Sequence, residues 1–176
     1  NNPVQNSTTL LNSGGSLNIS ASNTGGNANY VLTANGTIIN TQNNISSYTF
    51  THSNITQFQH YELQVTLVGT GVKTKNFDVL INQTTASAIM PTTYQDGITY
   101  LSDTEVVLVL FAPNKDYIYV AGSFNNWQPN SSYAMKYDPS RSKYWITLSG
   151  LTPGKIETYQ YWVVDKTPIG SALSLV

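Results

Sequence analysis

The sequence predicts an all-β protein built from two tandem β-sandwich domains. Three observations support this prediction: aromatic and β-branched residues dominate the patterned segments, apolar residues alternate with a period of two, and turn residues separate the segments. No stretch of ten or more residues has the three-then-four apolar spacing of an amphipathic helix. A length of 176 residues accommodates two domains of roughly 80 to 100 residues each.

The first half of the chain predicts a small sandwich of the immunoglobulin type. Residues 61–67 alternate strictly between apolar and polar side chains, and Asn35-Gly36 favours a tight hairpin because both residues tolerate positive φ. Five to seven short strands in about 80 residues are typical of such a sandwich. The predicted strands are residues 16–20, 29–33, 37–39, 47–51, 61–67 and 76–81.

A domain boundary is predicted next, because residues 82–88 are small, polar and without a periodic apolar pattern, and Pro91 ends any strand. Charge usage also changes there: the only charged side chains in residues 1–90 are Glu62, Lys73, Lys75 and Asp78. We therefore expect an immunoglobulin-like sandwich over residues 1–85 and a second sandwich, of early-set type, over residues 86–176.

The second domain predicts four strands separated by turns. Residues 113–116 and 152–154 contain the proline, glycine, asparagine and aspartate that turns prefer. Trp145 has apolar neighbours on both sides in its strand and is expected in the core. Residues 166–176 carry no turn that closes the fold, so we expect the domain to be truncated at its C-terminal end. The predicted strands are residues 105–111, 117–121, 143–148 and 158–164.

Residues 122–127, with the sequence Gly-Ser-Phe-Asn-Asn-Trp, resemble the strand-to-loop motif of family 48 carbohydrate-binding modules. Residues 151–154 resemble the Leu-Pro-Gly turn of that family, and residues 159–165 resemble its aromatic strand. The resemblance covers about 40% of the chain, roughly residues 96–164. The segment 91–100 is similar to segments of secreted bacterial α-amylase-type enzymes, in which an immunoglobulin-like domain often lies further upstream.

The resemblance implies a site for α-1,4-glucan with Trp127 as its stacking platform. An indole ring can cover the apolar C–H face of a glucose unit, and side-chain amides can donate to and accept from its hydroxyls. The hydrogen-bonding neighbours would be Asn125, Asn126 and Gln160, with Trp162 as a weaker candidate. The family's second tryptophan is absent from residues 165–168, and Gln160 stands where the family often has lysine. The competing interpretation places the Trp127 ring in the core, where it would anchor its loop.

The sequence is consistent with three functions. The first is a non-catalytic, starch- or glycogen-binding N-terminal region of a secreted α-amylase-type glycoside hydrolase, whose partners are α-glucan and the catalytic domain of the same polypeptide. The second is a structural spacer that positions a catalytic barrel without binding sugar. The third is a cell-surface adhesion module built from immunoglobulin-like repeats.

Composition argues against several other classes. A net charge of −1, with only 10% charged residues, supplies no basic stripe for nucleic acid or for an anionic membrane surface. The chain has no cysteine, no apolar run that could insert into a membrane, and no metal-ligand spacing around His52 or His60. The acidic residues are scattered, whereas glycoside hydrolysis needs a pair flanking the bond. We expect no cofactor, no metal and no catalytic residue in this chain.

Overall fold

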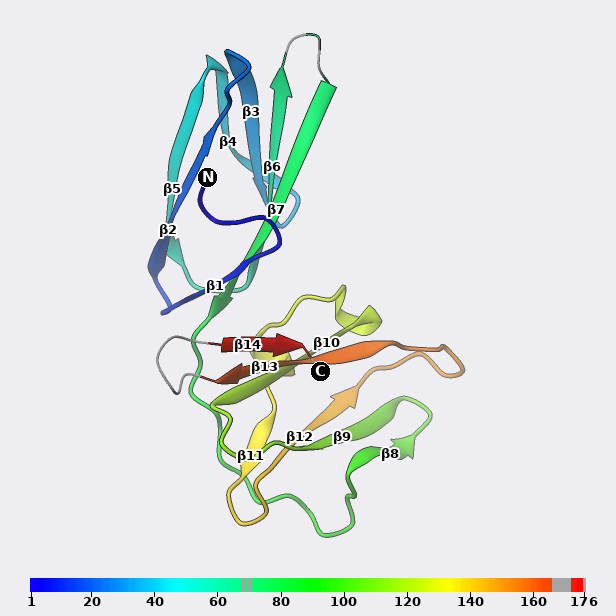
Figure 1. Cartoon of the computed structure of the whole chain (residues 1–176). Helices are drawn as coiled ribbons and strands as arrows, with labels where there is room; N and C mark the ends of the chain where they lie inside the picture. Colours follow the sequence, from blue (N-terminus) through cyan, green and yellow to red (C-terminus); the bar gives the residue numbers. More distant parts are fainter. Residues whose placement is uncertain (68, 70, 166–171, 176) are drawn as a thin grey trace. The chain divides into compact units, whose positions relative to one another are not determined.

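A computed structural model describes residues 1–67, 69, 71–165 and 172–175, the last four by their backbone only. The described residues form β-strands joined by turns and two single-turn 3₁₀ helices, which confirms the all-β prediction (Figure 1). The chain divides into two compact units, Asn1–Asn82 and Gln83–Val176. Each is a β-sandwich with its own buried core.

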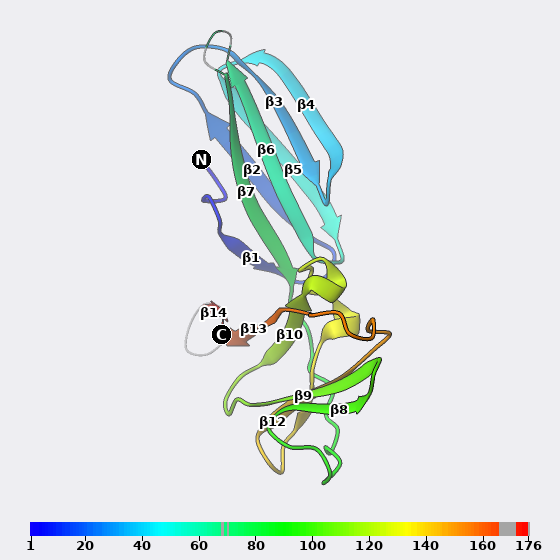
Figure 2. The same cartoon turned by 90° about the vertical axis from the view of Figure 1, so that its right-hand side faces the viewer.

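The first unit is an immunoglobulin-like sandwich of a five-stranded and a two-stranded sheet. The larger sheet has the order β1-β7-β6-β3-β4, in which β1 runs parallel to β7, and the smaller pairs β2 with β5. In Figure 2 the long strands β3, β6 and β7 run alongside one another. The strands are β1 (Thr8–Leu11), β2 (Gly15–Ser22), β3 (Ala28–Ala34), β4 (Thr37–Ile45), β5 (Ser47–Ile55), β6 (Gln59–Leu67) and β7 (Gly71–Ile81).

Aromatic rings fill the core between these two sheets. Tyr30 stacks on Tyr48 and Tyr61 stacks on Phe77, each pair with ring centroids 5.2 Å apart. Offset stacking of this kind adds to the free energy of burial. The β3–β4 turn has φ of 47° at Asn35 and 79° at the following glycine, which confirms the predicted hairpin.

The second unit packs a four-stranded sheet, in the order β11-β12-β9-β8, on a three-stranded sheet, in the order β10-β13-β14. Its two 3₁₀ helices are η1 (Ser123–Asn125) and η2 (Ser131–Tyr133). The strands are β8 (Gly97–Ser102), β9 (Glu105–Phe111), β10 (Tyr117–Gly122), β11 (Lys136–Asp138), β12 (Lys143–Ser149), β13 (Tyr159–Asp165) and β14 (Ala172–Leu175).

Both faces of β9 are buried, because apolar residues occupy successive positions along it. Val106 and Leu108 belong to the core between the two sheets. Val107 and Val109 form a smaller cluster with Trp145 on the opposite face of the sheet. The Trp145 indole nitrogen donates to the Ala88 carbonyl at 3.0 Å, so the prediction that this tryptophan packs in a core is confirmed.

Every strand predicted from the sequence is present, although most are longer than predicted, and four observed strands were not predicted. The missed strands are β1, β8, β11 and β14. They have three to six residues each, and every one lies at the edge of its sheet. Residues 166–171 and 176, on which the expected truncation depends, lie outside the described residues.

Candidate functional site

The loop that carries the predicted site leaves β10 at Gly122, where the backbone passes close to the start of β13. A Cβ atom at this position would lie 2.5 Å from the Thr158 carbonyl oxygen and 2.6 Å from a ring carbon of Phe124. The Ser123 amide then donates to the Thr158 carbonyl at 2.9 Å. Glycine is therefore required here by space, because its φ of −165° is an extended value that any residue adopts.

Asn125 closes the 3₁₀ turn η1 with its side chain. The residue is only 9% exposed, its Oδ1 accepts from the Gly122 amide at 2.8 Å, and its Nδ2 donates to the Val120 carbonyl at 3.1 Å. Both ends of the amide are thus used by the backbone of the loop. The Asn125 side chain therefore supports the loop.

Asn126 and Trp127 follow η1 and both have left-handed backbone conformations, with φ of 54° and 59°. Asparagine adopts this region readily, whereas for a residue as bulky as tryptophan it is an outlier that the surroundings must hold in place. The Trp127 amide donates to the Gly122 carbonyl at 2.9 Å, which fixes the turn. Trp127 is 43% exposed, which makes it the most exposed of the three tryptophans.

Gln160 and Trp162 lie on β13, the strand that pairs antiparallel with β10. Gln160 is half-buried opposite Ala121, one residue before the glycine that starts the loop. Trp162 lies opposite Tyr119 and is only 8% exposed. The loop therefore gathers Asn125, Asn126 and Trp127 in succession, while Trp162 offers no open ring face.

A hydrogen bond to Glu157, which is itself ion-paired, ties η1 to the loop between β12 and β13. The Glu157 carboxylate accepts a hydrogen bond from the Ser123 hydroxyl and pairs with the Lys155 ammonium at 2.7 Å. The hydrogen bonds from Lys155 and then Ser123 lower the pKa of Glu157, so the carboxylate stays charged at neutral pH. Sequence reasoning missed this contact, because Glu157 lies 34 positions from Ser123 and outside the segments that resemble the family.

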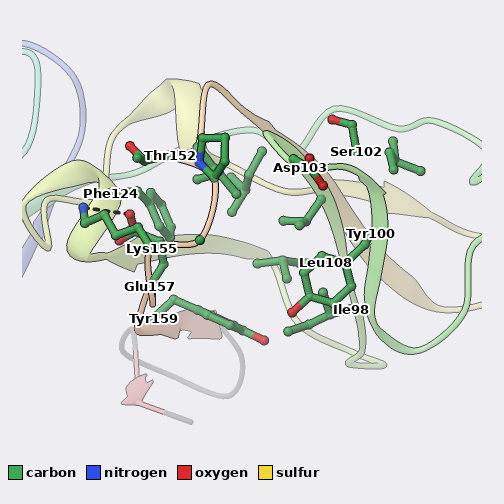
Figure 3. Close-up of a pocket in the computed structure, with 16 residues that line it drawn as sticks. Ile98, Tyr100, Ser102, Asp103, Leu108, Phe124, Thr152, Lys155, Glu157 and Tyr159 are labelled. Atoms are coloured by element: carbon green, nitrogen blue, oxygen red, sulfur yellow. Dashed lines mark ion pairs between the residues drawn. The ribbon is translucent and has the colours of Figure 1, made fainter.

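A groove of about 760 Å³, called the β8 groove below, opens beside this ion pair. Figure 3 shows Ile98 and Tyr100 of β8 on one side of it, and Phe124, Glu157 and Tyr159 on the other. Core residues of β9 and β12 also line it. No sequence signal pointed to this groove, because β8 was not predicted as a strand.

Within the described part of the chain, no group of three or more histidine or acidic side chains is placed to hold a metal ion. The same residues contain no helix that is long and apolar enough to span a lipid bilayer.

No protein-family model and no curated protein matches this chain. Solved structures resemble it at low identity. The fibronectin(III)-like modules of Clostridium thermocellum CbhA are 10% identical, with a TM-score of 0.40 over 99% of this chain and 89% of theirs. A pullulanase from Anoxybacillus sp. LM18-11, complexed with maltotriose, is 10% identical, with a TM-score of 0.37 over 95% of this chain and 24% of the pullulanase. The Ig1-2 module of the Drosophila receptor protein tyrosine phosphatase DLAR is 11% identical, with a TM-score of 0.35 over 97% of this chain and 90% of that one.

Identities near 10% and TM-scores of 0.40 or below identify neither a family nor an activity. The chain's own fold and loop define it as a pair of immunoglobulin-like β-sandwiches, the second of which holds a strained, partly exposed tryptophan in the loop after β10.

Proposed function

We propose that the second unit is a family 48-like carbohydrate-binding module that binds α-1,4-glucan on Trp127, in a starch- or glycogen-active protein. The observation that supports this is the open indole at the loop after β10, in a run of residues that resembles the family's motif. A flat indole face buries the apolar side of a pyranose with little loss of side-chain entropy. Asn126, which is exposed beside Trp127, supplies a donor and an acceptor for sugar hydroxyls.

The proposal changes the set of binding residues that the resemblance implies. Asn125 and Trp162 are removed as sugar contacts, because the first is committed to the backbone and the second is buried. Gln160 stays as a secondary contact at the base of the loop. One ring and few polar groups predict weak binding, with a dissociation constant from tens of micromolar to millimolar, or about 4 to 6 kcal/mol.

In this proposal the chain is the non-catalytic N-terminal region of a secreted bacterial α-amylase-type glycoside hydrolase. The first unit of the chain then serves as the upstream immunoglobulin-like domain. Besides α-glucan, the chain has a second partner, the catalytic domain of the same polypeptide. The division of the chain into two sandwich units supports this domain order.

Isothermal titration of the full chain with maltoheptaose tests the glucan site. We expect Trp127→Ala to weaken binding at least about tenfold, a loss of about 1.4 kcal/mol. The matched control is Phe111→Ala, which removes another exposed aromatic ring of the same unit and should leave the affinity unchanged. Equal heats for the wild type and Trp127→Ala would end the proposal.

The alternative of a spacer without sugar binding rests on a specific observation. Trp162 is buried, so Trp127 is the one tryptophan of the candidate site that can stack on a sugar. The Asn125 side chain is hydrogen-bonded to the backbone of its own loop. The spacer hypothesis predicts that the chain washes off insoluble starch as freely as its Trp127→Ala variant. Firm retention of the wild type alone would contradict it.

A further inference from the structure

Strand β8 is both an edge strand of its sheet and one wall of the β8 groove. Strand β8 is the last strand of its sheet and pairs with β9 alone among the described strands. Figure 1 shows β12, β9 and β8 side by side in that order, with β8 outermost. An edge strand presents a row of backbone N–H and C=O groups that are open to a further strand.

The inner face of β8 is unusually open for a strand of a sandwich. Ile98 lies opposite Leu108 and Tyr100 lies opposite Val106 in the β8–β9 register, so both point to the face that carries the core. Nevertheless, Ile98 is 43% exposed and Tyr100 is 77% exposed. Across the groove they face η1 and the loop before β13 in place of a strand (Figure 3).

Natural edge strands are normally protected by charges, prolines or bulges. In the first unit, Lys73 and Lys75 stand on the edge half of β7, on the same face as the buried Phe77. Strand β8 has the sequence Gly-Ile-Thr-Tyr-Leu-Ser, without charge or proline, and its one bulge lies at its C-terminal end. This edge therefore lacks the usual defence and carries apolar side chains beside a groove, which are the two features that strand addition uses.

We propose that β8 docks an extended segment of a protein partner, which adds a strand to the sheet and inserts alternate apolar side chains into the β8 groove. The backbone hydrogen bonds would supply affinity, and the groove would select the side chains at alternate positions. Trp127 is not among the residues that line the groove, and the proposal does not depend on glucan binding.

Charge identifies the chemistry of the partner. Strand β8 is flanked by Asp96, whose side chain is 59% exposed although it pairs with Lys143 at 2.8 Å, and by the exposed Asp103. A second copy of the chain, paired antiparallel about the centre of β8, would set Asp96 against Asp103 and repel. An extended segment that is apolar in its middle and basic at its ends meets both carboxylates favourably.

The probe is an end-blocked peptide of three isoleucines alternating with two threonines between terminal lysines, titrated into the isotope-labelled full chain. We expect amide shifts that concentrate on β8 and the lining of its groove. We also expect the dissociation constant to rise at least about fivefold when both lysines are replaced by glutamate. Absence of shifts on β8, or equal affinity of the two peptides, would overturn the proposal.

Two matched pairs test the docking geometry. Only one edge of the peptide can face β8, so N-methylation of one alternate set of its residues should abolish binding and methylation of the other set should preserve it.

Tyr100→Lys, which puts a charge on the open inner face, should weaken binding at least about tenfold. Phe111→Lys changes an exposed aromatic residue outside the groove and should have no effect.

Three outcomes would refute strand addition: equal effects of the two methylated peptides, equal effects of the two lysine variants, or displacement of the peptide by maltoheptaose. The last outcome would assign the β8 groove to sugar.

Discussion

Trp127 has a left-handed backbone conformation, which costs a bulky L-residue about 1 to 3 kcal/mol. It has this conformation although the residue is exposed to solvent. An exposed turn could use glycine or asparagine at no such cost. A ring that contributes to binding would account for a tryptophan at this position.

The strain can be measured by comparing two truncations of the same side chain. Trp127→Ala and Trp127→Gly both remove the indole, but only glycine relieves the positive φ. We expect the glycine variant to be more stable than the alanine variant by about 1 kcal/mol in urea unfolding, while both lose maltoheptaose binding. An alanine variant that is equally or more stable would contradict the left-handed conformation.

The backbone at Gly122 leaves no room for a side chain, and this can be tested by substitution. Gly122→Ala places a methyl group against the Thr158 carbonyl and should destabilise the chain by about 1 to 3 kcal/mol in urea unfolding. Gly154→Ala is the matched control, because nothing lies within 4 Å of its Cβ position and only its φ of 74° opposes the change. A Gly122→Ala variant as stable as the wild type would show that the loop gives way at no cost.

The sequence predicted which loop carries the candidate site, because its residues resemble a known motif. It did not predict the hydrogen-bond partners of the side chains in that loop. The run of residues 122–127 pointed to the loop, but it could not indicate that the Asn125 amide turns back to Val120 and Gly122. The tie between Ser123 and Glu157 exists only after folding brings distant segments together.

At the scale of elements, the predicted strands were those whose side chains alternate or that form continuous apolar runs. Strand β6 is an example of alternation, and β9 is an example of a strand buried on both faces. Strands β1 and β8 escaped prediction because an edge strand buries little and so needs no strong apolar pattern.

The segment that leads into β8 is pinned by one buried carboxylate. Asp138 accepts from the Met90 amide at 3.0 Å and from the Ser140 hydroxyl at 2.6 Å, and Arg141 donates to the Met90 carbonyl at 2.8 Å. The hydrogen bond from Ser140 and then that from Met90 lower the pKa of Asp138 below its ordinary value of 3.8. This contact fixes the turn after β11 to the segment before β8.

A lowered pKa in the folded state gives a defined pH dependence of stability. The contribution of Asp138 is fully present above the unfolded-state pKa of 3.8 and is lost as pH falls through the lower folded-state value. In urea unfolding at a series of pH values, Asp138→Asn should lower stability at pH 7 and flatten its decline in acid. Ser140→Ala should produce a smaller change of the same kind. A parallel decline in wild type and Asp138→Asn would rule out this role.

At the scale of the whole chain, each unit has a core drawn entirely from its own residues. Leu32→Ala, a truncation of a side chain buried in the first core, should lower the free energy of unfolding of the first unit by about 2 to 5 kcal/mol. The maltoheptaose affinity of the folded chain should stay unchanged. Ile118→Ala, in the second core, is the counterpart and should destabilise the unit that carries Trp127. Weakened sugar binding in the folded Leu32→Ala variant would contradict this assignment.

The chain has three tryptophans, Trp127, Trp145 and Trp162, and each gives one indole N–H signal in a nitrogen–proton spectrum. Single Trp→Phe variants assign the three signals, and maltoheptaose is then titrated into the wild-type chain. If Trp127 carries the glucan site, its signal moves progressively to saturation, while those of Trp145 and Trp162 stay in place because both residues are buried. A Trp127 signal that stays in place at millimolar sugar would contradict it.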